Sequence, residues 1–160
     1  MTVNTKLTKK DFINASLTVM FSRPFLRYFL VIIFLIALIN TVAGISKGAN
    51  PLSGFLPPLI ILVLYSSFVY FSVGKAYLKN IRASENMEYS FDENNLTIKG
   101  ESFKSELSWD KIPKVTQTKN WLLIWQGGQI ANAIPKRDIP DGLPAELKTI
   151  LAKKGVKNNL

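Results

Sequence analysis

The stretch Tyr28-Phe-Leu-Val-Ile-Ile-Phe-Leu-Ile-Ala-Leu-Ile39 decides the fold class of this chain. It lies in a segment, residues 28–46, that carries no charge over about 19 positions, just enough helix to cross a bilayer. A second charge-free segment runs from Gly48 to Gly74, with its apolar part over residues 55–73. The sequence therefore predicts two transmembrane helices, spanning about residues 26–45 and 55–75.

The segment between the two spans is rich in Gly, Pro and Ser and has Lys47 as its only charge, which predicts a short turn. Basic residues gather at the other ends of the spans. These flanking residues are Arg23, Arg27, Lys75, Lys79 and Arg82. Because basic flanks stay in the cytoplasm, we expect a hairpin with both termini inside and the short loop outside.

A cleaved signal peptide is the alternative for the first span, because Thr41-Val-Ala43 loosely resembles a cleavage site. The positive region before this span is about 27 residues long, far beyond an ordinary n-region. The second span would also still anchor the product. The sequence therefore favours an uncleaved helix.

The formal net charge of +9 raises the possibility of nucleic-acid binding. Most of that charge lies before Asn86, where nine basic residues oppose only Asp11 and Glu85. This placement favours a membrane-orientation signal, and we expect no nucleic-acid partner. The chain has no cysteine and no histidine, so thiolate and imidazole catalysis and Cys/His metal sites are excluded. We expect no cofactor and no metal.

Ahead of the first span, residues 1–24 are predicted to form an amphipathic N-terminal segment. Thr8-Lys-Lys-Asp11 matches a capping box with Asp in place of Glu, and apolar residues follow at helical spacing up to Pro24. The sequence leaves open whether this helix lies on the membrane surface or on the second domain.

The second transmembrane helix is expected to continue past the membrane to about Ala83, and residues 86–156 then form a cytoplasmic domain. Short alternating segments bounded by turn residues predict six strands in this domain. The expected strands are 88–92, 96–99, 105–109, 115–119, 121–125 and 130–134, with a turn at 126–128. Leu143 to Lys153 then predicts an amphipathic helix ended by Gly155, after which the last residues, 157–160, are expected to be frayed.

The predicted fold class is membrane α+β, with a transmembrane hairpin over residues 25–85 and a small antiparallel β domain closed by a C-terminal helix. Several phrases in the sequence resemble the YcxB-like family of uncharacterised bacterial membrane proteins. They are Leu7-Thr-Lys-Lys-Asp-Phe12, Tyr89-Ser-Phe91, Leu96-Thr-Ile98, Ser105-Glu-Leu-Ser-Trp-Asp-Lys-Ile112 and Ala133-Ile-Pro-Lys-Arg137. The resemblance implies a pleckstrin-homology-like β domain at the bacterial cytoplasmic (inner) membrane. It implies no catalytic residues.

Five residues are the candidates for a binding site. Trp109, Trp121 and Trp125 are of a type favoured at interaction surfaces, although tryptophan in a short strand is more often core. Trp121 and Trp125 share a strand face, so one of them could be exposed or meet the membrane. Lys136 and Arg137 could hold a lipid phosphate or an acidic partner, or instead form local ion pairs with Asp138 or Asp141.

Five further carboxylates of the domain lie in turns and on alternating strand faces, so a solvated surface is the better interpretation than a catalytic pair. They are Asp92, Glu93, Glu101, Glu106 and Asp110. We expect a non-enzymatic, membrane-tethered binding module whose partners are membrane lipids and a protein, either a toxin or a second copy of the chain. An immunity protein that neutralises a secreted toxin is the alternative. Spans without an intramembrane charge favour an anchor over a channel.

Overall fold

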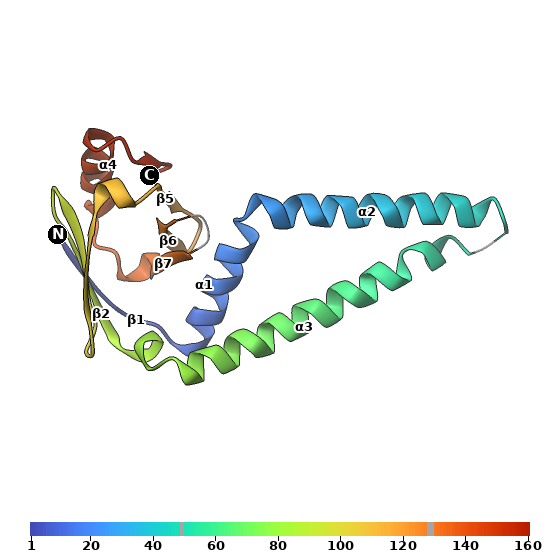
Figure 1. Ribbon diagram of the computed structural model, residues 1–160, viewed down its shortest axis with the longest axis horizontal. Helices are drawn as coiled ribbons and strands as arrows, with labels where there is room; N and C mark the ends of the chain where they lie inside the picture. Colours follow the sequence, from blue (N-terminus) through green and yellow to red (C-terminus); the bar gives the residue numbers. More distant parts are fainter. Residues whose placement is uncertain (49, 128–129) are drawn as a thin grey trace.

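The computed structural model describes residues 1–160 except 49 and 128–129. Two long helices, α2 (Pro24–Ile45) and α3 (Leu56–Lys79), project from a β-rich domain and converge at their far end (Figure 1). Within the described residues, the segments Pro24–Ile45 and Leu52–Lys79 are long and apolar enough to cross a membrane. The predicted spans thus coincide with helices. The predicted turns at 45–54 and 126–128 lie partly outside the described residues.

Local chemistry explains why α2 and α3 are uninterrupted helices. Each has proline in its first turn, where the missing N–H has no intrahelical partner to lose. The hydroxyls of Ser66 and Ser67 donate to the carbonyls of Leu62 and Val63 at 2.8 and 2.9 Å, as expected for serine inside an apolar helix. Helix α3 therefore satisfies these polar groups internally.

The two helices touch near their far ends. Ala37 and Thr41 of α2 are buried there against the short 3₁₀ helix η1 (Pro51–Gly54). A Cβ atom at Gly54 would lie 2.6 Å from the backbone nitrogen of Thr41, so only glycine allows this close approach. The hairpin is consequently closed at its tip and open toward the β domain, as Figure 1 shows.

The expected continuation of α3 to Ala83 is wrong. The helix ends at Lys79, because Asn80 adopts an extended backbone and residues Ile81–Ser84 form a 3₁₀ turn, η2. Contacts with the β domain hold this turn. The guanidinium of Arg82 lies 4.9 Å from the ring centroid of Phe103, and the Glu85 carboxylate accepts hydrogen bonds from the backbone and hydroxyl of Ser102.

The β domain contains two four-stranded sheets. The first sheet has the order β1-β2-β3-β4 and is antiparallel throughout, and the second has the order β7-β6-β5-β8, with β8 parallel to β5. The strands are β1 (Thr2–Lys6), β2 (Asn86–Phe91), β3 (Asn95–Lys99), β4 (Lys104–Ser108), β5 (Lys114–Gln117), β6 (Trp121–Gln126), β7 (Ile130–Pro135) and β8 (Lys157–Asn158). All six predicted strands are present, although β4 and β5 end earlier than expected.

Strand β1 was not predicted from the sequence. It lies before the helical hairpin and pairs with β2, which follows it, so that Val3 stands opposite Tyr89. Val3 and Thr5 face inward and are buried, while Asn4 and Lys6 are exposed. The two long helices are therefore inserted between the first two strands of one sheet.

Helix α4 (Leu143–Lys153) covers the core shared by the two sheets. Leu143, Leu147 and Leu151 are buried together with side chains from both sheets, and Ile150 is half-buried against them. The predicted apolar face of this helix is thus confirmed. Gly155 follows the helix with a φ of +69°, which favours glycine.

The expected fraying of residues 157–160 is wrong. Val156 is buried in the core, and β8 pairs with β5. The Asn159 side chain accepts from the Gln117 amide at 2.6 Å and donates to the Gln117 carbonyl at 3.3 Å. These contacts fix the end of the chain more firmly than its polar composition suggests.

Helix α1 (Lys9–Phe21) crosses the open end of the hairpin. Its predicted capping box is present, since the Thr8 and Asp11 side chains each bind the other's backbone N–H. On one side, Phe12 stacks at a tilt on Tyr77 of α3 with ring centroids 5.5 Å apart. On the other side, Ala15 and Val19 pack on the second sheet. Of the two positions that the sequence left open for α1, the structure shows packing on the second domain, with the long helices on the other side of α1.

Candidate functional site

The three candidate tryptophans are all buried. Trp109 is 1% exposed and lies in a 3₁₀ turn (Trp109–Lys111), where its indole N–H donates to the Asp92 carbonyl at 2.9 Å. Trp121 and Trp125 are 6% and 1% exposed. The prediction that tryptophan here serves the core fits this burial, and an exposed position for Trp121 or Trp125 does not.

Strand β6 is buried on both faces, which explains why its tryptophans are hidden. Leu122 and Ile124 point into the core between the two sheets. Trp121, Leu123 and Trp125 form a second cluster with Ala15 of α1. The strand thus has a continuous apolar sequence because helix α1 covers the face that would otherwise meet water.

The candidate Arg137 lies in a 3₁₀ turn after β7 (Lys136–Asp138), where it joins three distant parts of the chain. Its guanidinium forms a two-pronged ion pair with Asp11 of α1, with N···O distances of 3.0 and 2.7 Å. It also lies 3.5 Å from Asp138, which accepts a hydrogen bond from the Thr5 hydroxyl of β1. The ion pair expected with Asp138 is present, but its stronger partner is Asp11.

Arg137 holds the pKa of Asp11 well below its ordinary value, chiefly through the hydrogen bonds of its guanidinium, with further help from Thr8. We expect Asp11→Asn to lower the free energy of unfolding by about 1 kcal/mol at pH 7, discounted because the Arg137 side chain is 57% exposed. A depressed pKa stabilises the fold above the unfolded pKa of about 3.9, and this contribution falls away as pH drops below it. Denaturation curves of the unmodified protein and of Asp11→Asn at pH 7 and pH 3 measure this contribution. The difference between their free energies of unfolding should be smaller at pH 3.

The matched control for this prediction is Asp141→Asn. It removes the same charge from an exposed aspartate that forms no ion pair with the described residues. Its curves should overlay those of the unmodified protein at both pH values. Equal losses in the two variants would mean that net charge, and not the Arg137 pair, sets the effect.

A basic groove with a volume of about 830 Å³ runs beside this ion pair. It is bounded by α1, by the start of α2, by the β5–β6 turn and by the end of β7. Its lining comprises Asp11, Asn14, Leu17, Thr18, Phe21, Ser22, Arg27, Lys119, Asn120, Trp121, Pro135, Lys136 and Arg137. The groove therefore brings together three of the five candidates, Trp121, Lys136 and Arg137, and leaves Trp109 and Trp125 outside.

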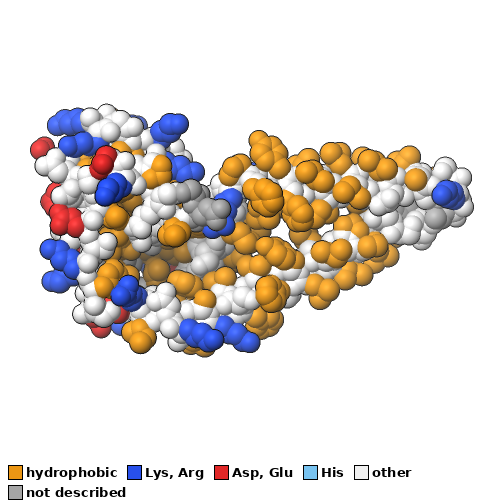
Figure 2. Space-filling model, in the orientation of Figure 1, with side chains coloured by type: hydrophobic (Ala, Val, Ile, Leu, Met, Phe, Trp, Pro, Cys, Tyr) orange, Lys and Arg blue, Asp and Glu red, His pale blue; other side chains and the backbone are white. Residues whose placement is uncertain are grey.

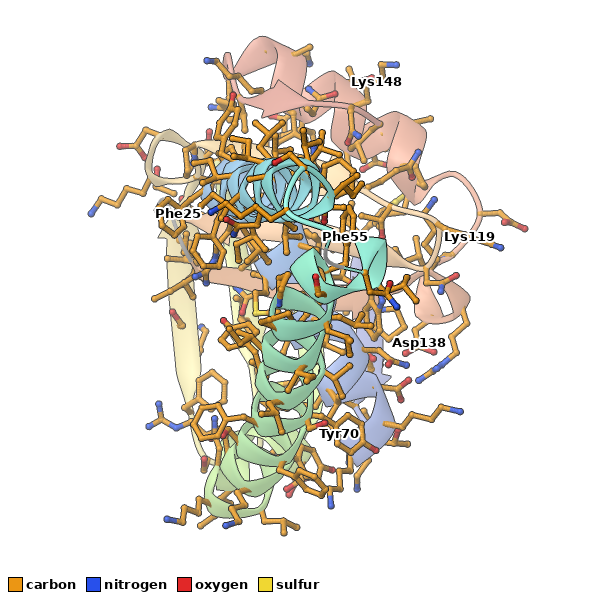
Figure 3. The ribbon with its side chains drawn as sticks, turned by 90° about the vertical axis from the view of Figure 1, so that its right-hand side faces the viewer. Phe25, Phe55, Tyr70, Lys119, Asp138 and Lys148 are labelled. Atoms are coloured by element: carbon orange, nitrogen blue, oxygen red, sulfur yellow. The ribbon has the colours of Figure 1, made fainter. Side chains whose placement is uncertain are left out.

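The groove carries excess positive charge. Asp11 is its one carboxylate, and Arg137 balances it, so Arg27, Lys119 and Lys136 remain as uncompensated cations. None of these three forms an ion pair within the described part of the chain. Figure 3 shows Lys119 and Asp138 on the same side of the molecule, opposite Phe25. Such a groove can bind a phosphate or another anion.

Arg27 and Lys119 were missed as site residues. Arg27 was assigned only to the topogenic flank, and Lys119 was assigned to a strand, which ends at Gln117. Lys119 instead lies in the tight β5–β6 turn, where the Thr118 amide donates to the Trp121 carbonyl at 2.8 Å. Nothing near either residue in the sequence predicts the groove, because its walls come from two segments, residues 11–27 and 119–137, that lie far apart in the chain.

A second, apolar cleft lies between α2 and α3 where the hairpin is open, and α1 closes its domain end. Its volume is about 560 Å³. The walls are formed by Leu17, Met20 and Phe21 of α1, by residues 25–33 of α2, and by residues 58–70 of α3. It is lined by hydrocarbon and aromatic side chains, with Ser66 as a polar exception.

The carboxylates predicted to be solvated are all exposed: Asp92, Glu93, Glu101, Glu106 and Asp110. Glu85 is instead 5% exposed and was not singled out from the sequence. Hydrogen bonds from the Ser102 hydroxyl and amide lower the pKa of Glu85, which suits a structural anchor for the β3–β4 turn. Among the described residues, no three or more His, Cys, Asp or Glu side chains are placed to hold a metal ion.

The β domain matches a known protein family. Residues 91–151, which run from β2 to α4, match the family described as YcxB-like protein. The chain is also 26% identical over 119 residues to the uncharacterized protein YcxB of Bacillus subtilis (strain 168). That similarity covers 68% of this chain and 64% of the relative, which is less than two thirds of the relative's length.

The family match over the β domain and the relative show that this chain is similar to the YcxB-like family, which confirms the resemblance noted in the sequence. Neither description names an activity, a ligand or a partner. No solved structure matches the chain significantly.

Proposed function

We propose that this chain is a membrane-anchored, non-enzymatic binding module that holds its β domain against the cytoplasmic surface of a bilayer. Under this proposal, α2 and α3 cross the membrane, and both termini lie in the cytoplasm. The main support is the band of exposed hydrophobic side chains over α2 and α3 (Figure 2). Positive side chains lie where the helices join the domain and at the far tip, and the band between them is uncharged.

The size of the exposed apolar surface favours a bilayer over water. Large side chains such as Ile39 and Phe68 are 66% and 69% exposed, and most of their neighbours along both helices are similarly uncovered. An apolar surface of this extent would drive association in water. Two uncovered apolar helices of transmembrane length are stable in hydrocarbon because their backbone hydrogen bonds are made internally.

The distribution of basic residues supports the proposed orientation. Arg23 and Arg27 precede the body of α2, and Lys75 and Lys79 end α3, so these four cations lie at the domain end of the hairpin. Lys47 is the single charge at the opposite end. By the positive-inside rule, this asymmetry places the β domain in the cytoplasm.

We also infer that the β domain belongs to the pleckstrin-homology-like class. The order of the elements supports this inference: four sequential antiparallel strands are followed by three more strands and by a C-terminal helix over the shared core. Under this view, the membrane hairpin is an insertion between the first two strands. The hypothesis of an immunity protein gains no support from the matched family or the relative, because neither description mentions a toxin.

The absence of cysteine makes the proposed topology directly testable. We expect Lys47→Cys, in the loop at the tip, to react in intact cells with a membrane-impermeant maleimide. Lys104→Cys, on β4, should react only after the cells are permeabilised. Alkaline extraction of membranes should leave both variants in the pellet. Labelling in the reverse pattern, or release by alkali, would contradict the proposal.

A further inference from the structure

The basic groove and the apolar cleft meet along one face of α1. Leu17 and Phe21 line both of them, so these two side chains form the boundary between the cavities. On the groove side lie the three uncompensated cations, Arg27, Lys119 and Lys136. On the cleft side lie the aromatic and aliphatic side chains of α2 and α3. A charged cavity and a hydrocarbon cavity are thus adjacent.

Helix α2 joins the two cavities directly. Arg27 lies in the groove, and Leu30, one turn later on neighbouring helix surface, lines the cleft. The Nε of Arg27 donates to the Phe21 carbonyl at 3.3 Å, which fixes the start of the guanidinium beside the boundary. Its terminal nitrogens form no ion pair within the described residues, so they remain able to bind a phosphate.

We propose that this composite site holds one anionic phospholipid. Its phosphate lies among Arg27, Lys119 and Lys136, and an acyl chain occupies the cleft between α2 and α3. The proposal rests on the proposed membrane insertion, because only then does the start of α2, which carries Arg27, lie at the depth of the lipid headgroups. Charge complementarity selects an anionic lipid over a zwitterionic one, since the Arg137–Asp11 pair is already neutral and three positive charges remain.

The adjoining cleft favours a lipid over a free anion. A soluble phosphate would satisfy the cations and leave about 560 Å³ of hydrocarbon-lined space unfilled. The cleft is bounded at its domain end by α1 and otherwise by side chains of α2 and α3, so under the proposed insertion it opens within the hydrocarbon of the bilayer. An acyl chain enters such an opening without crossing a polar barrier.

Native mass spectrometry of the detergent-purified full-length chain tests the proposal. With phosphatidylglycerol and phosphatidylcholine supplied in equal amounts, we expect one phosphatidylglycerol to be retained in preference. Lys119→Ala/Lys136→Ala should weaken this retention roughly 25-fold, about fivefold for each lysine near an anionic headgroup. The variant Lys119→Arg/Lys136→Arg keeps both charges and should retain the lipid.

Two further variants separate the parts of the site. Lys99→Ala/Lys104→Ala removes two exposed lysines on β3 and β4 that do not line the groove, and it should leave retention unchanged. Leu30→Trp fills part of the cleft without changing charge, and it should reduce retention several-fold. Thermal unfolding of each variant confirms that it is folded before its lipid binding is compared.

Equal retention of the two lipids by the unmodified chain would overturn the proposal. So would displacement of the bound lipid by millimolar inorganic phosphate, which indicates a free-anion site, or a dimer without lipid, which assigns the cleft to a second copy. If the topology experiment supports membrane insertion and lipid selectivity is absent, only this inference fails. If alkali releases the chain from membranes, the proposed function itself fails.

Discussion

Replacement of Trp109 by alanine is expected to lower the free energy of unfolding of the β domain by about 3–5 kcal/mol. Trp109 is among the largest fully buried side chains in the described residues, and it packs with side chains from both sheets and from α4. The substitution removes this packing and leaves a cavity that the surrounding strands cannot fill. It also leaves the Asp92 carbonyl without its indole donor.

Urea denaturation of the full-length chain in detergent measures this loss, with near-ultraviolet circular dichroism as the signal for the β domain. Trp109→Phe is the matched control, because it keeps an aromatic ring in the core and removes the donor. Trp109→Phe should lower the free energy of unfolding by about 1–2 kcal/mol, which is clearly less than the loss expected for Trp109→Ala. A loss below about 1 kcal/mol for Trp109→Ala would show that this tryptophan does not hold the two sheets together.

Val3→Asp is expected to destabilise the β domain by a comparable amount, about 3–5 kcal/mol, because it places a carboxylate in the core without a partner. Val3 is 1% exposed and lies opposite Tyr89, the residue whose hydroxyl pKa burial raises to about 12. The same burial that disfavours a tyrosinate would disfavour an aspartate. The substitution would therefore detach β1 from the edge of β2.

Asn4→Asp provides a closely matched control, since it adds the same charge to the adjacent residue of the same strand. Asn4 is exposed, so its variant should unfold within about 0.5 kcal/mol of the unmodified protein. Hydrogen exchange of the β2 amides gives an independent readout, and it should accelerate in Val3→Asp alone. Equal stability of the two variants would mean that β1 contributes no buried core, contrary to the structure.

Much of the fold was predictable because the decisive signals are local. Residues 28–39 have no polar side chain except the Tyr28 hydroxyl, and such a run can only form a buried or membrane-spanning element. The turn residues between short alternating segments placed β2 to β7 within a few residues. The leucine spacing of α4 and the capping box of α1 were equally readable, since each depends on side chains within one or two helical turns.

The errors arose where a distant part of the chain decides the local structure. The alternation of apolar and polar residues over residues 2–6 is too weak to predict a strand. The segment forms one because β2 has an unpaired edge with which it can pair. Residues 157–160 look unstructured, yet β5 supplies the partner that orders them. The continuation of α3 to Ala83 was plausible by propensity, and the anchoring of Arg82 and Glu85 to the β3–β4 turn prevents it.

The candidate site was likewise only partly predictable from the sequence. Lys136 and Arg137 were identified because two adjacent cations follow a proline at a strand end. Their surroundings could not be deduced, since the partner of Arg137 is Asp11, 126 residues away. The tryptophans of β6 were recognised as sharing one face, but only the position of α1 shows that this face is covered.

The sequence by itself determined that this chain has two helices with uncharged stretches of transmembrane length, basic residues gathered at one end of them and a β-rich domain after them. These properties follow from composition and from periodicity over a few residues. Tertiary structure alone decided that the hairpin is inserted into the β domain, that α1 fills the space between them, and that a basic groove adjoins an apolar cleft. Those features depend on pairings across more than 80 residues, which local physical preferences do not encode.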